Sequence, residues 1–377
     1  MVVLTGRRRP RVAIAHDYLT QRGGAERVIL AMLRAFPDAT VHTTLYDPAG
    51  TYPEFREARV VTSPINRIPQ FRQDHRLALP LLPGAINRLP VDADVVIASS
   101  SGWAHGVPTT GRKLVYCHAP AKWLYQPAAY LGHQPSASIK GRALQTMSPW
   151  LRRWDRLAAA SADRYLANST VVRDRVKAAY GIDAAIAFPP FGVGDDGPQR
   201  EVREVADWRD GYHLVVSRLL PYKNVTEAIA AFRGLPDHRL VVVGHGPLED
   251  DLRADFPSNV RLVNGLDDAG LRWVYAHATA LIAPSIEDFG LTPLEAGAFG
   301  KPTLALRGGG YLDTVVEDVT GMFFDAPTPD AIRSAVLAAS LRRWDGEAIT
   351  KHVDQFSEPR FHERLTAEVE GLLALRR

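Results

Sequence analysis

The sequence contains a single cysteine and no long apolar run. One thiol, Cys117, cannot form a disulfide within the chain, which fits a reducing compartment and excludes a disulfide-stapled secreted domain. No stretch approaches the roughly 18 consecutive apolar residues of a membrane-spanning helix. At the start of the chain, arginines follow a short apolar piece, which is the reverse of the order in a signal peptide. We therefore expect a cytoplasmic protein.

An excess of charge of one sign is also missing. The formal net charge is +3 over 377 residues, which is too small to indicate a nucleic-acid partner. The GxGxxG fingerprint of dinucleotide-binding folds does not follow the first predicted strand, and this weakens a dehydrogenase interpretation. The 46% hydrophobic and 23% charged fractions are those of an ordinary globular protein, and the length favours about two domains.

Short apolar strands alternate with helical segments through both halves of the chain. In the first half the expected strands are 11–15, 40–44, 94–98, 113–117, 165–167 and 184–188. In the second half they are 213–216, 239–243, 260–263, 280–283 and 303–306. Such alternation predicts parallel sheets covered by helices, so the expected fold class is α/β with two doubly wound domains.

Residues 191–211 separate the two halves, because glycine, proline and charged residues cluster there. We expect an N-terminal domain over residues 1–192 and a C-terminal domain over residues 210–350. A last helix within 356–377 has no third core to join, so we expect it to pack back on the N-terminal domain.

The stretch 284–302 carries two carboxylates, Glu287 and Glu295, eight positions apart after a predicted strand. A helix is expected from about residue 292, with Thr292 as N-cap and Glu295 completing a capping box. One interpretation is that Glu295 is only a cap. The other is that the helix N-terminus faces a crevice that binds an anion, while the carboxylates accept hydrogen bonds from hydroxyls. A phosphate combined with hydroxyls describes a nucleotide sugar.

Two cations follow the strand 213–216, namely Arg218 and Lys223. Arginine can bind a diphosphate bidentately and lysine can bind it as a point charge, although both could equally be solvated surface residues. The turn containing Gly244 and Gly246 allows close approach of backbone to a base or phosphate, or is a plain turn.

Several polar or glycine-containing motifs follow the predicted strands of the first half. They are His16-Asp17, Gly23-Gly24, Ser99-Ser100-Ser101 with the nearby His105, and His118-Ala119-Pro120. Ligands of parallel sheets bind beyond the carboxyl ends of the strands, so these motifs are candidate binding residues. For the two histidines His16 and His105 and for the glycine pair, a plain loop or turn stays an alternative.

Residues 64–90 mix arginines and leucines between prolines. One interpretation is a basic, apolar lip that contacts a lipid-linked phosphate or a membrane surface. The favoured interpretation is a solvated segment whose leucines pack inward, because the prolines cut any amphipathic helix short.

Taken together, these motifs resemble those of glycosyltransferase family 4, which has the GT-B fold of two Rossmann-like domains facing across a cleft. EDFGLTPLE, from Glu287 to Glu295, is similar to the family's Glu-x7-Glu motif, SRLLPYKN to its Arg…Lys pair, and RGGAE to its glycine loop. Pieces such as HDYLTQRGGAERV, YCHAPAKWLY and VVVGHGPLE resemble a mannosyltransferase-like branch along nearly the whole chain.

The resemblance implies a retaining transfer from a nucleotide sugar, with no bound metal and no further cofactor. It implies that Glu295 holds the ribose, Glu287 the donor sugar, and Arg218 with Lys223 the diphosphate. Further implied donor contacts come from His118, Gly23, Gly24, Phe289, Gly290, Leu291, Gly244 and Gly246. The acceptor, a glycan, a lipid-linked molecule or a small molecule, would meet His16, Asp17, Ser100, His105 and Lys122.

The chain departs from the branch pattern at Lys122, Gln126, His105 and Asp313. These departures leave the donor and the acceptor open, with mannose from GDP-mannose as the first expectation and a UDP-sugar as an alternative. A nucleotide-sugar epimerase and a non-catalytic two-lobed binding module are the rival function classes.

Overall fold

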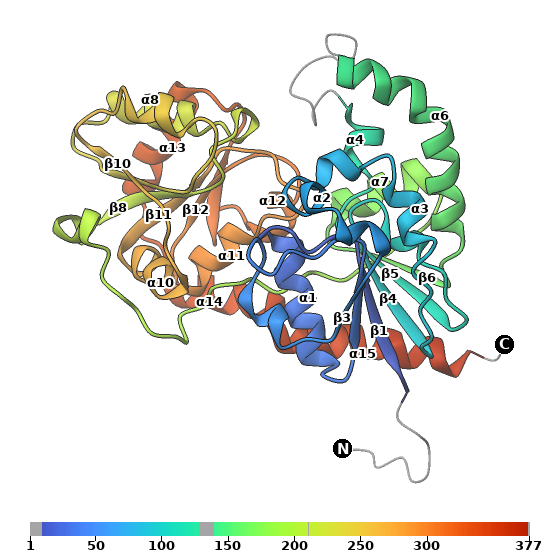
Figure 1. Cartoon of the computed structure of the whole chain (residues 1–377). Helices are drawn as coiled ribbons and strands as arrows, with labels where there is room; N and C mark the ends of the chain where they lie inside the picture. Colours follow the sequence, from blue (N-terminus) through green and yellow to red (C-terminus); the bar gives the residue numbers. More distant parts are fainter. Residues whose placement is uncertain (1–9, 128–138, 210, 376–377) are drawn as a thin grey trace. The chain divides into compact units, whose positions relative to one another are not determined.

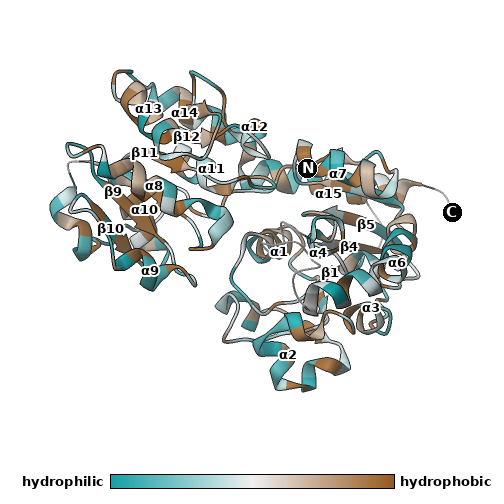
Figure 2. Ribbon diagram, turned by 90° about the horizontal axis from the view of Figure 1, so that it is seen from above, coloured by the Kyte–Doolittle hydropathy of each residue, from teal (hydrophilic) through white to brown (hydrophobic). Residues whose placement is uncertain are grey.

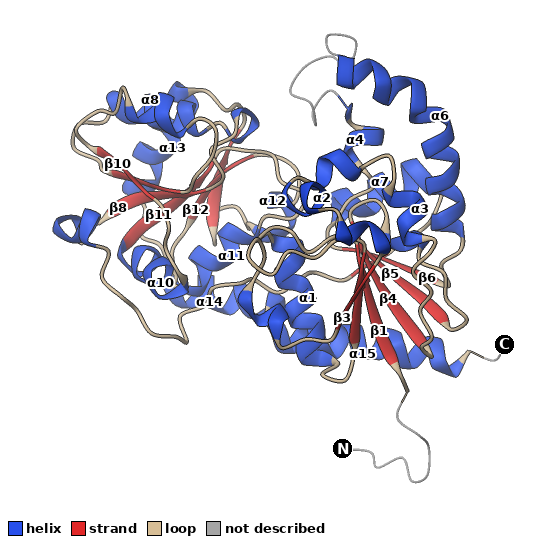
Figure 3. Cartoon of the chain, viewed as in Figure 1, coloured by secondary structure: helices blue, strands red, loops and turns tan. Residues whose placement is uncertain are grey.

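The computed structural model describes residues 10–127, 139–209 and 211–375. The chain divides into two compact units, one of Met1–Pro189 with Glu358–Arg377 and one of Pro190–Ser357 (Figure 1). In each unit the strands form one parallel sheet and helices surround it (Figure 3). The predicted α/β class with two doubly wound sheets is confirmed.

The sheet of the first unit has the strand order β3-β2-β1-β4-β5-β6-β7. Its strands are β1 (Val12–His16), β2 (Thr40–Thr43), β3 (Val60–Thr62), β4 (Val95–Ser100), β5 (Arg112–Cys117), β6 (Arg164–Ala167) and β7 (Ala185–Ile186). The strand order reverses between β1 and β4, where His16 is the register partner of Ser99. Ligands of doubly wound sheets bind at the carboxyl edge of such a reversal.

The sheet of the second unit has the strand order β10-β9-β8-β11-β12-β13. Its strands are β8 (Tyr212–Val216), β9 (Leu240–Val243), β10 (Val260–Val263), β11 (Ala278–Ala283), β12 (Thr303–Leu306) and β13 (Gly321–Phe324). Here the order reverses between β8 and β11, which pair in parallel. The loops after these two strands therefore share the edge at which a ligand is expected.

Helices connect the strands in both units. The first unit contains α1 (Gly24–Ala35), α2 (Pro69–Gln73), α3 (Leu82–Ile86), α4 (Lys122–Tyr125), α6 (Ile139–Ala160), α7 (Thr170–Tyr180) and α15 (Glu358–Ala374). The second contains α8 (Val225–Arg233), α9 (Glu249–Arg253), α10 (Asp268–His277), α11 (Leu291–Ala298), α12 (Tyr311–Thr314), α13 (Pro329–Ser340) and α14 (Gly346–Val353).

Most predicted strands are confirmed within a few residues, but β3 and β13 were not predicted. Helix α6 begins at Ile139 and accommodates Pro149. Helix α4 is short and ends at Tyr125. Residues 1–9 and 128–138, which fall within the predicted N-terminal domain, lie outside the described residues.

The central strands of each sheet are buried on both faces, since every residue of β4 and of β9 is buried. Hydrophobic residues are visible among the strands of the second sheet in Figure 2. In β1, Ile14 joins the core that contains residues of α1 and α15, whereas Ala13 joins the core that contains residues of α6 and α7. Successive side chains of a strand point to opposite faces, which explains this division. The apolar residues of the strands therefore anchor each sheet in its core. The polar residues that follow the strands lie at the carboxyl edge of the sheet.

Helix α15 belongs to the first unit although it is the last helix of the chain. Phe361 packs edge-on against Tyr116 of β5, with 5.7 Å between the ring centroids. Leu365 and Leu372 are fully buried in the same core as Ile14. Apolar burial of this kind fixes the helix against the sheet far more strongly than its surface ion pairs do.

One buried histidine makes the stability of the second unit dependent on pH. Burial of His213 in β8, together with the charge of His238 at a ring distance of 5.5 Å, lowers the pKa of His213 to about 4. The unfolded chain takes up this proton near pH 6.5, whereas the folded unit does not. The resulting stabilisation is present above pH 6.5 and is lost as the pH falls toward 4.

We therefore expect His213→Leu to flatten the pH dependence of unfolding. Between pH 6.5 and 4.5 the wild type should lose up to about 1.4 kcal/mol per pH unit more than the variant, because only its unfolded state gains the proton. Urea unfolding followed by circular dichroism at several pH values measures the two slopes. Equal slopes in both proteins would contradict the assignment.

Candidate functional site

The loops that follow β8 and β11 are joined directly in the second unit. Asn224 stands at the end of the loop after β8 with φ 53, in the left-handed region that asparagine tolerates. Its amide Nδ2 donates a 2.8 Å hydrogen bond to the carbonyl oxygen of Pro284, the first residue after β11. The two loops at the strand-order reversal are therefore held together.

This junction carries an ion pair between Lys223 and Glu287. The ammonium of Lys223 donates to Oε1 of Glu287, which also accepts a 2.6 Å hydrogen bond from the hydroxyl of Ser285. The Lys223 side chain is only 11% exposed and that of Glu287 is 27% exposed. A cation buried to this degree needs an anionic partner, and Glu287 provides it.

Arg218 lies in the same loop but in a different environment. Its side chain is exposed, and its Nη2 donates a 3.2 Å hydrogen bond to the hydroxyl of Tyr222. Tyr222 is itself half exposed, and its ring lies 5.2 Å from the ammonium of Lys223. The two predicted cations thus differ, since Lys223 is already paired whereas Arg218 is on the surface.

The predicted capping box at Glu295 is wrong. Helix α11 begins at Leu291, one residue before the predicted N-cap Thr292, and its N-cap is Gly290 without a side-chain bond. Gly290 has φ 94, and a Cβ there would lie 2.5 Å from the ring of Tyr311, so glycine is required. The interpretation of Glu295 as a simple cap is therefore excluded.

Glu295 lies inside α11 and is only 7% exposed. Its Oε2 accepts a 2.8 Å hydrogen bond from the hydroxyl of Tyr275, a fully buried residue of α10. A buried carboxylate must be hydrogen-bonded, and Tyr275 meets part of that need. Tyr275 was not predicted, because nothing in the sequence of α10 connects it to a residue twenty positions later.

Glycines pack the loops of this site against each other. A Cβ on Gly244 would lie 1.8 Å from the carbonyl oxygen of Ser217, and one on Gly309 would lie 2.2 Å from that of Glu287. The backbone N–H of Gly310 donates to the same Glu287 oxygen at 2.8 Å. Gly244 therefore makes room for the loop of Arg218, and the glycine run 308–310 fixes the backbone of Glu287.

Gly246, predicted with Gly244 to approach a donor, also faces protein. A Cβ on Gly246 would lie 2.5 Å from the carbonyl oxygen of Leu219. The other predicted donor contacts, Phe289 and Leu291, flank the N-cap of α11, where Phe289 is buried and Leu291 is half-buried. Backbone N–H groups of a helix start are those that bind anions, so this part of the prediction stays open.

In the first unit, the carboxylate of Asp17 is hydrogen-bonded to the protein's own backbone. Its carboxylate accepts hydrogen bonds from the backbone N–H groups of Ser101, Trp103 and Ala104 at 2.5, 2.9 and 2.6 Å, and Asp17 is 2% exposed. Both oxygens therefore hold the loop after β4, and an acceptor role of Asp17 stays a prediction. Ser100 plays a similar part, since its buried hydroxyl accepts from the N–H of Gly102 at 3.1 Å.

His105 also contacts other residues of the protein, while its acceptor role stays a prediction. It is 1% exposed, with Nε2 lying 3.0 Å from Oδ1 of Asp155 and Nδ1 lying 3.1 Å from the hydroxyl of Tyr165. The ring packs beside Trp154 at 5.9 Å. Lys122 is exposed at the start of α4, where an acceptor role stays a prediction.

The glycine pair lies at the start of α1, where Gly23 is the N-cap and Gly24 is the first residue. A Cβ on Gly23 would lie 2.6 Å from Oε2 of Glu26, so the glycine leaves room for a buried carboxylate. Glu26 is 1% exposed, and its Oε1 accepts a 3.2 Å hydrogen bond from Gln21. Sequence reasoning missed Glu26 because acidic residues are ordinary in a first helical turn.

Three further side chains meet at the strand-order reversal of the first sheet. Nδ1 of His16 lies 3.1 Å from the carbonyl oxygen and 3.2 Å from the hydroxyl of Ser99, and that hydroxyl lies 2.7 Å from Nε2 of His118. Burial, helped by the charge of His16, lowers the pKa of His118 to about 3. Burial alone would lower the pKa of His16, but Glu26, Asp17 and the Ser99 carbonyl outweigh it and raise that pKa.

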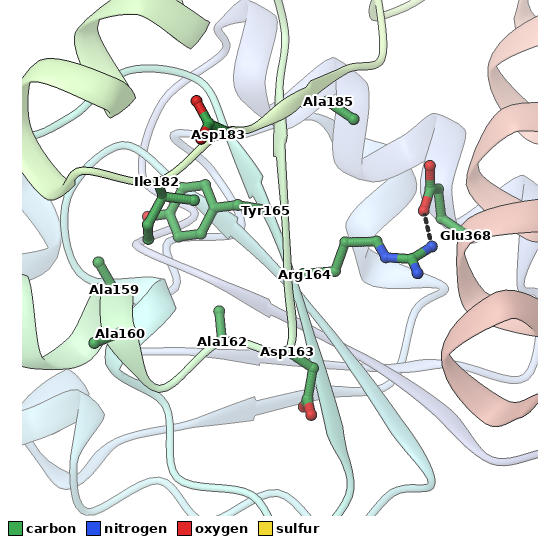
Figure 4. Close-up of a pocket in the computed structure, with 10 residues that line it drawn as sticks. All are labelled: Ala159, Ala160, Ala162, Asp163, Arg164, Tyr165, Ile182, Asp183, Ala185 and Glu368. Atoms are coloured by element: carbon green, nitrogen blue, oxygen red, sulfur yellow. Dashed lines mark hydrogen bonds and ion pairs between the residues drawn. The ribbon is translucent and has the colours of Figure 1, made fainter. Parts of the chain in front are cut away.

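A cavity of about 490 Å³ opens elsewhere in the first unit (Figure 4). It lies beside the amino ends of β6 and β7, whereas the polar groups above follow the carboxyl ends of strands. Arg164 points across it to Glu368 of α15, with 2.5 Å between Nη1 and Oε2. This cavity is therefore separate from the candidate site.

The described ranges contain no group of three or more histidine, cysteine, aspartate or glutamate residues arranged to hold a metal ion. Among the helices of the same ranges, none combines the length and the apolar character needed to cross a bilayer.

Both units match known families. Residues 22–193 match the family described as Glycosyltransferase Family 4, and residues 199–348 match that described as Glycosyl transferases group 1. A GDP-mannose-dependent alpha-(1-6)-phosphatidylinositol monomannoside mannosyltransferase of Mycolicibacterium smegmatis is 31% identical over 226 residues, which are 52% of this chain and 59% of the relative. A glycogen synthase of Pseudomonas fluorescens is 30% identical over 167 residues, which are 40% of this chain and 34% of that protein. The chain thus spans a third to three fifths of these two relatives.

Solved structures share the fold over nearly the full chain. Sucrose-phosphate synthase from Thermosynechococcus elongatus superimposes with a TM-score of 0.71 at 16% identity, covering 97% of this chain and 99% of that one. Anabaena HepE in complex with UDP gives a TM-score of 0.69 at 15% identity, covering 96% and 100%. At this level of sequence identity, the structural similarity shows only that the fold is shared.

We expect Tyr275→Phe to destabilise the second unit by about 1–3 kcal/mol, because it removes a donor from the buried carboxylate of Glu295. The matched control is Tyr212→Phe, whose equally buried hydroxyl donates at 2.8 Å to the neutral carbonyl of Val274 and should cost only about 1 kcal/mol. Urea unfolding at pH 7 measures both. If Tyr275→Phe costs no more than its control, Glu295 does not depend on Tyr275.

Proposed function

Since the chain belongs to glycosyltransferase family 4 and has the GT-B fold, we propose that it transfers a hexose from a nucleotide sugar with retention of the anomeric configuration. The first expectation for the donor is GDP-mannose, which the name of the mycobacterial relative supports. A UDP-sugar is the alternative, which the UDP complex of the HepE structure supports. The second unit would bind the donor and the first unit the acceptor.

The observation that carries the proposal is the ion pair of Lys223 and Glu287 at the strand-order reversal of the second sheet. A diphosphate arriving there offers Lys223 a stronger anionic partner than one carboxylate does. Glu287, released from the ammonium, can then accept hydrogen bonds from hydroxyls of the donor sugar. The exposed Arg218 can reorient to bind the diphosphate bidentately at little cost.

The leaving group sets the chemistry of the step. As the bond between the sugar and the diphosphate breaks, negative charge grows on the phosphate oxygens. Lys223, Arg218 and the N–H groups at the start of α11 would stabilise this charge, and groups fixed in advance do so without reorganisation. Glu295, held by Tyr275, would accept hydrogen bonds from the ribose hydroxyls and keep the nucleotide in register.

The acceptor would be a glycan, a lipid-linked molecule or a small molecule bound by the first unit. A membrane-bound acceptor is favoured by the surface of residues 68–81, where Ile68, Leu77 and Leu81 are at least 40% exposed. Arg67, just before this stretch, and Arg76 within it would face anionic headgroups.

Substitutions of the two glutamates should affect nucleotide binding and turnover separately. Glu295→Gln is expected to weaken binding of GDP or UDP roughly 10- to 100-fold, since it removes hydrogen bonds to a charged group. Glu287→Gln is expected to lower kcat by a similar factor while leaving nucleoside diphosphate affinity at least as high as in the wild type. Calorimetric titration and initial rates measure the two effects.

Glu317→Gln is the control, because Glu317 forms an exposed ion pair with Arg307 in the same unit. Unchanged nucleotide affinity in Glu295→Gln would remove the ribose role from the proposal. Failure of GDP, UDP and the other nucleoside diphosphates to bind the wild type would overturn the proposed function as a whole.

Transfer should also proceed without a divalent cation, because Lys223 and Arg218 provide the positive charge that the diphosphate requires. We expect the rate in excess EDTA to equal the rate without it within about twofold. A reversible loss of activity, restored by adding Mg²⁺ or Mn²⁺, would contradict this part of the proposal.

A further inference from the structure

The first sheet contains a connected row of buried polar side chains that the proposed function does not use. His16 ends β1, Ser99 is its register partner on β4, and His118 follows β5. They are 2%, 0% and 9% exposed, so water does not compete for their hydrogen bonds. The directions of these bonds can therefore be worked out from the donors and acceptors themselves.

A backbone carbonyl fixes the direction of the hydrogen bond between His16 and Ser99. The oxygen of Ser99 lies 3.1 Å from Nδ1 of His16, and a carbonyl oxygen only accepts. Nδ1 of His16 must therefore carry a hydrogen atom. The hydroxyl oxygen of Ser99 lies 3.2 Å from the same nitrogen and accepts a share of this bond.

The direction of the hydrogen bond between Ser99 and His118 follows from that between His16 and Ser99. With its oxygen accepting from His16, the hydroxyl of Ser99 has one hydrogen to donate, and Nε2 of His118 lies 2.7 Å away. Nε2 of His118 is then an acceptor without a hydrogen. A neutral imidazole carries one N–H, so in His118 that N–H is at Nδ1.

The electrostatic surroundings keep the row in this state. Oε1 of Glu26 lies 3.9 Å from Nε2 of His16, and Glu26 is 1% exposed, so His16 has an anion on its far side. Within the described residues, Oε2 of Glu26 has no hydrogen-bond partner, so the carboxylate has few other donors to satisfy it. A positive charge on His16 in turn keeps the neighbouring His118 neutral, in line with its lowered pKa.

We propose that His16 and Ser99 are positioning residues that hold His118 as a neutral imidazole with its hydrogen on Nδ1, ready to donate to an oxygen atom of a sugar bound at this edge of the first sheet. In the described residues Nδ1 of His118 makes no hydrogen bond, and His118 retains its 9% exposure. Only the identity of this ligand rests on the proposed function. The tautomer itself depends on the row of hydrogen bonds alone.

The tautomer can be observed directly in the protein without any ligand. In protein labelled with ¹⁵N-histidine, we expect Nε2 of His118 to show the chemical shift of an acceptor nitrogen and Nδ1 that of a protonated one. Comparison with a His118→Gln spectrum assigns the signals. A protonated Nε2 in the wild type would overturn the proposal.

Variants of Ser99 test its part in the row. Ser99→Ala should shift His118 toward a mixture of tautomers, whereas Ser99→Thr, which keeps a hydroxyl, should restore the wild-type spectrum. The control is Ser63→Ala, which removes a similarly buried hydroxyl that donates to the carbonyl of Thr44 at 2.8 Å. An unchanged His118 spectrum in Ser99→Ala would contradict the proposal.

Variants of His16 separate the hydrogen bond from the charge. His16→Asn places an amide N–H near the position of Nδ1 without a charge, so the tautomer of His118 should persist. His16→Leu removes the donor and should give the mixed spectrum of Ser99→Ala. Mixed spectra in both variants would show that the charge of His16, and not its hydrogen bond, sets the state of His118.

The kinetic consequence completes the test. Ser99→Ala should lower kcat roughly 3- to 10-fold with a smaller change in KM for the donor, and Ser99→Thr should recover most of it. Ser63→Ala should leave both unchanged. If the tautomer is as proposed but no nucleotide sugar is turned over, the proposed function fails and the positioning role stands. If transfer occurs although Nε2 of His118 is protonated, the positioning role fails and the proposed function stands.

Discussion

The contact on which the second unit depends is the ion pair between Lys223 and Glu287. A nearly buried ammonium is costly unless an anion accompanies it. The surrounding residues all serve to place that anion. Asn224 ties the two loops together, Ser285 bonds the same carboxylate oxygen, and the glycine run 308–310 fixes the backbone from which Glu287 projects. These contacts together hold the ammonium of Lys223 and the carboxylate of Glu287 at the strand-order reversal.

The first unit uses the same topological position but different chemistry. Its strand-order reversal lies between β1 and β4, where a hydrogen-bonded row runs from His16 through Ser99 to His118, and Glu26 lies 3.9 Å from His16. Asp17, which is adjacent to His16, fixes the neighbouring loop through three backbone N–H groups. One edge thus carries a paired cation, and the other carries a buried row of hydrogen-bonding groups that ends at His118.

The sequence was sufficient for the fold because strands and helices alternate with clear hydrophobic patterns. It was insufficient where the strand was short, as in β3, or where a backbone angle decided the outcome, as at Gly290. The motif residues Lys223 and Glu287 were predicted from their position after strands. For Asp17 and His105 the sequence did not reveal the contacts within the protein, because a polar residue at a strand end can be bonded by the protein's own backbone or core. Tyr275 and Glu26 were missed, since their partners come from tertiary packing.

The central claim is that Lys223 exchanges Glu287 for a diphosphate. A double-mutant cycle with Lys223→Met and Glu287→Gln, read out as nucleoside diphosphate affinity, tests it most directly. If Glu287 and the diphosphate compete for Lys223, removing the Glu287 charge improves nucleoside diphosphate affinity about tenfold more in the presence of Lys223 than in its absence. Equal improvements in both backgrounds would show that the pair never opens to the ligand and would contradict the account.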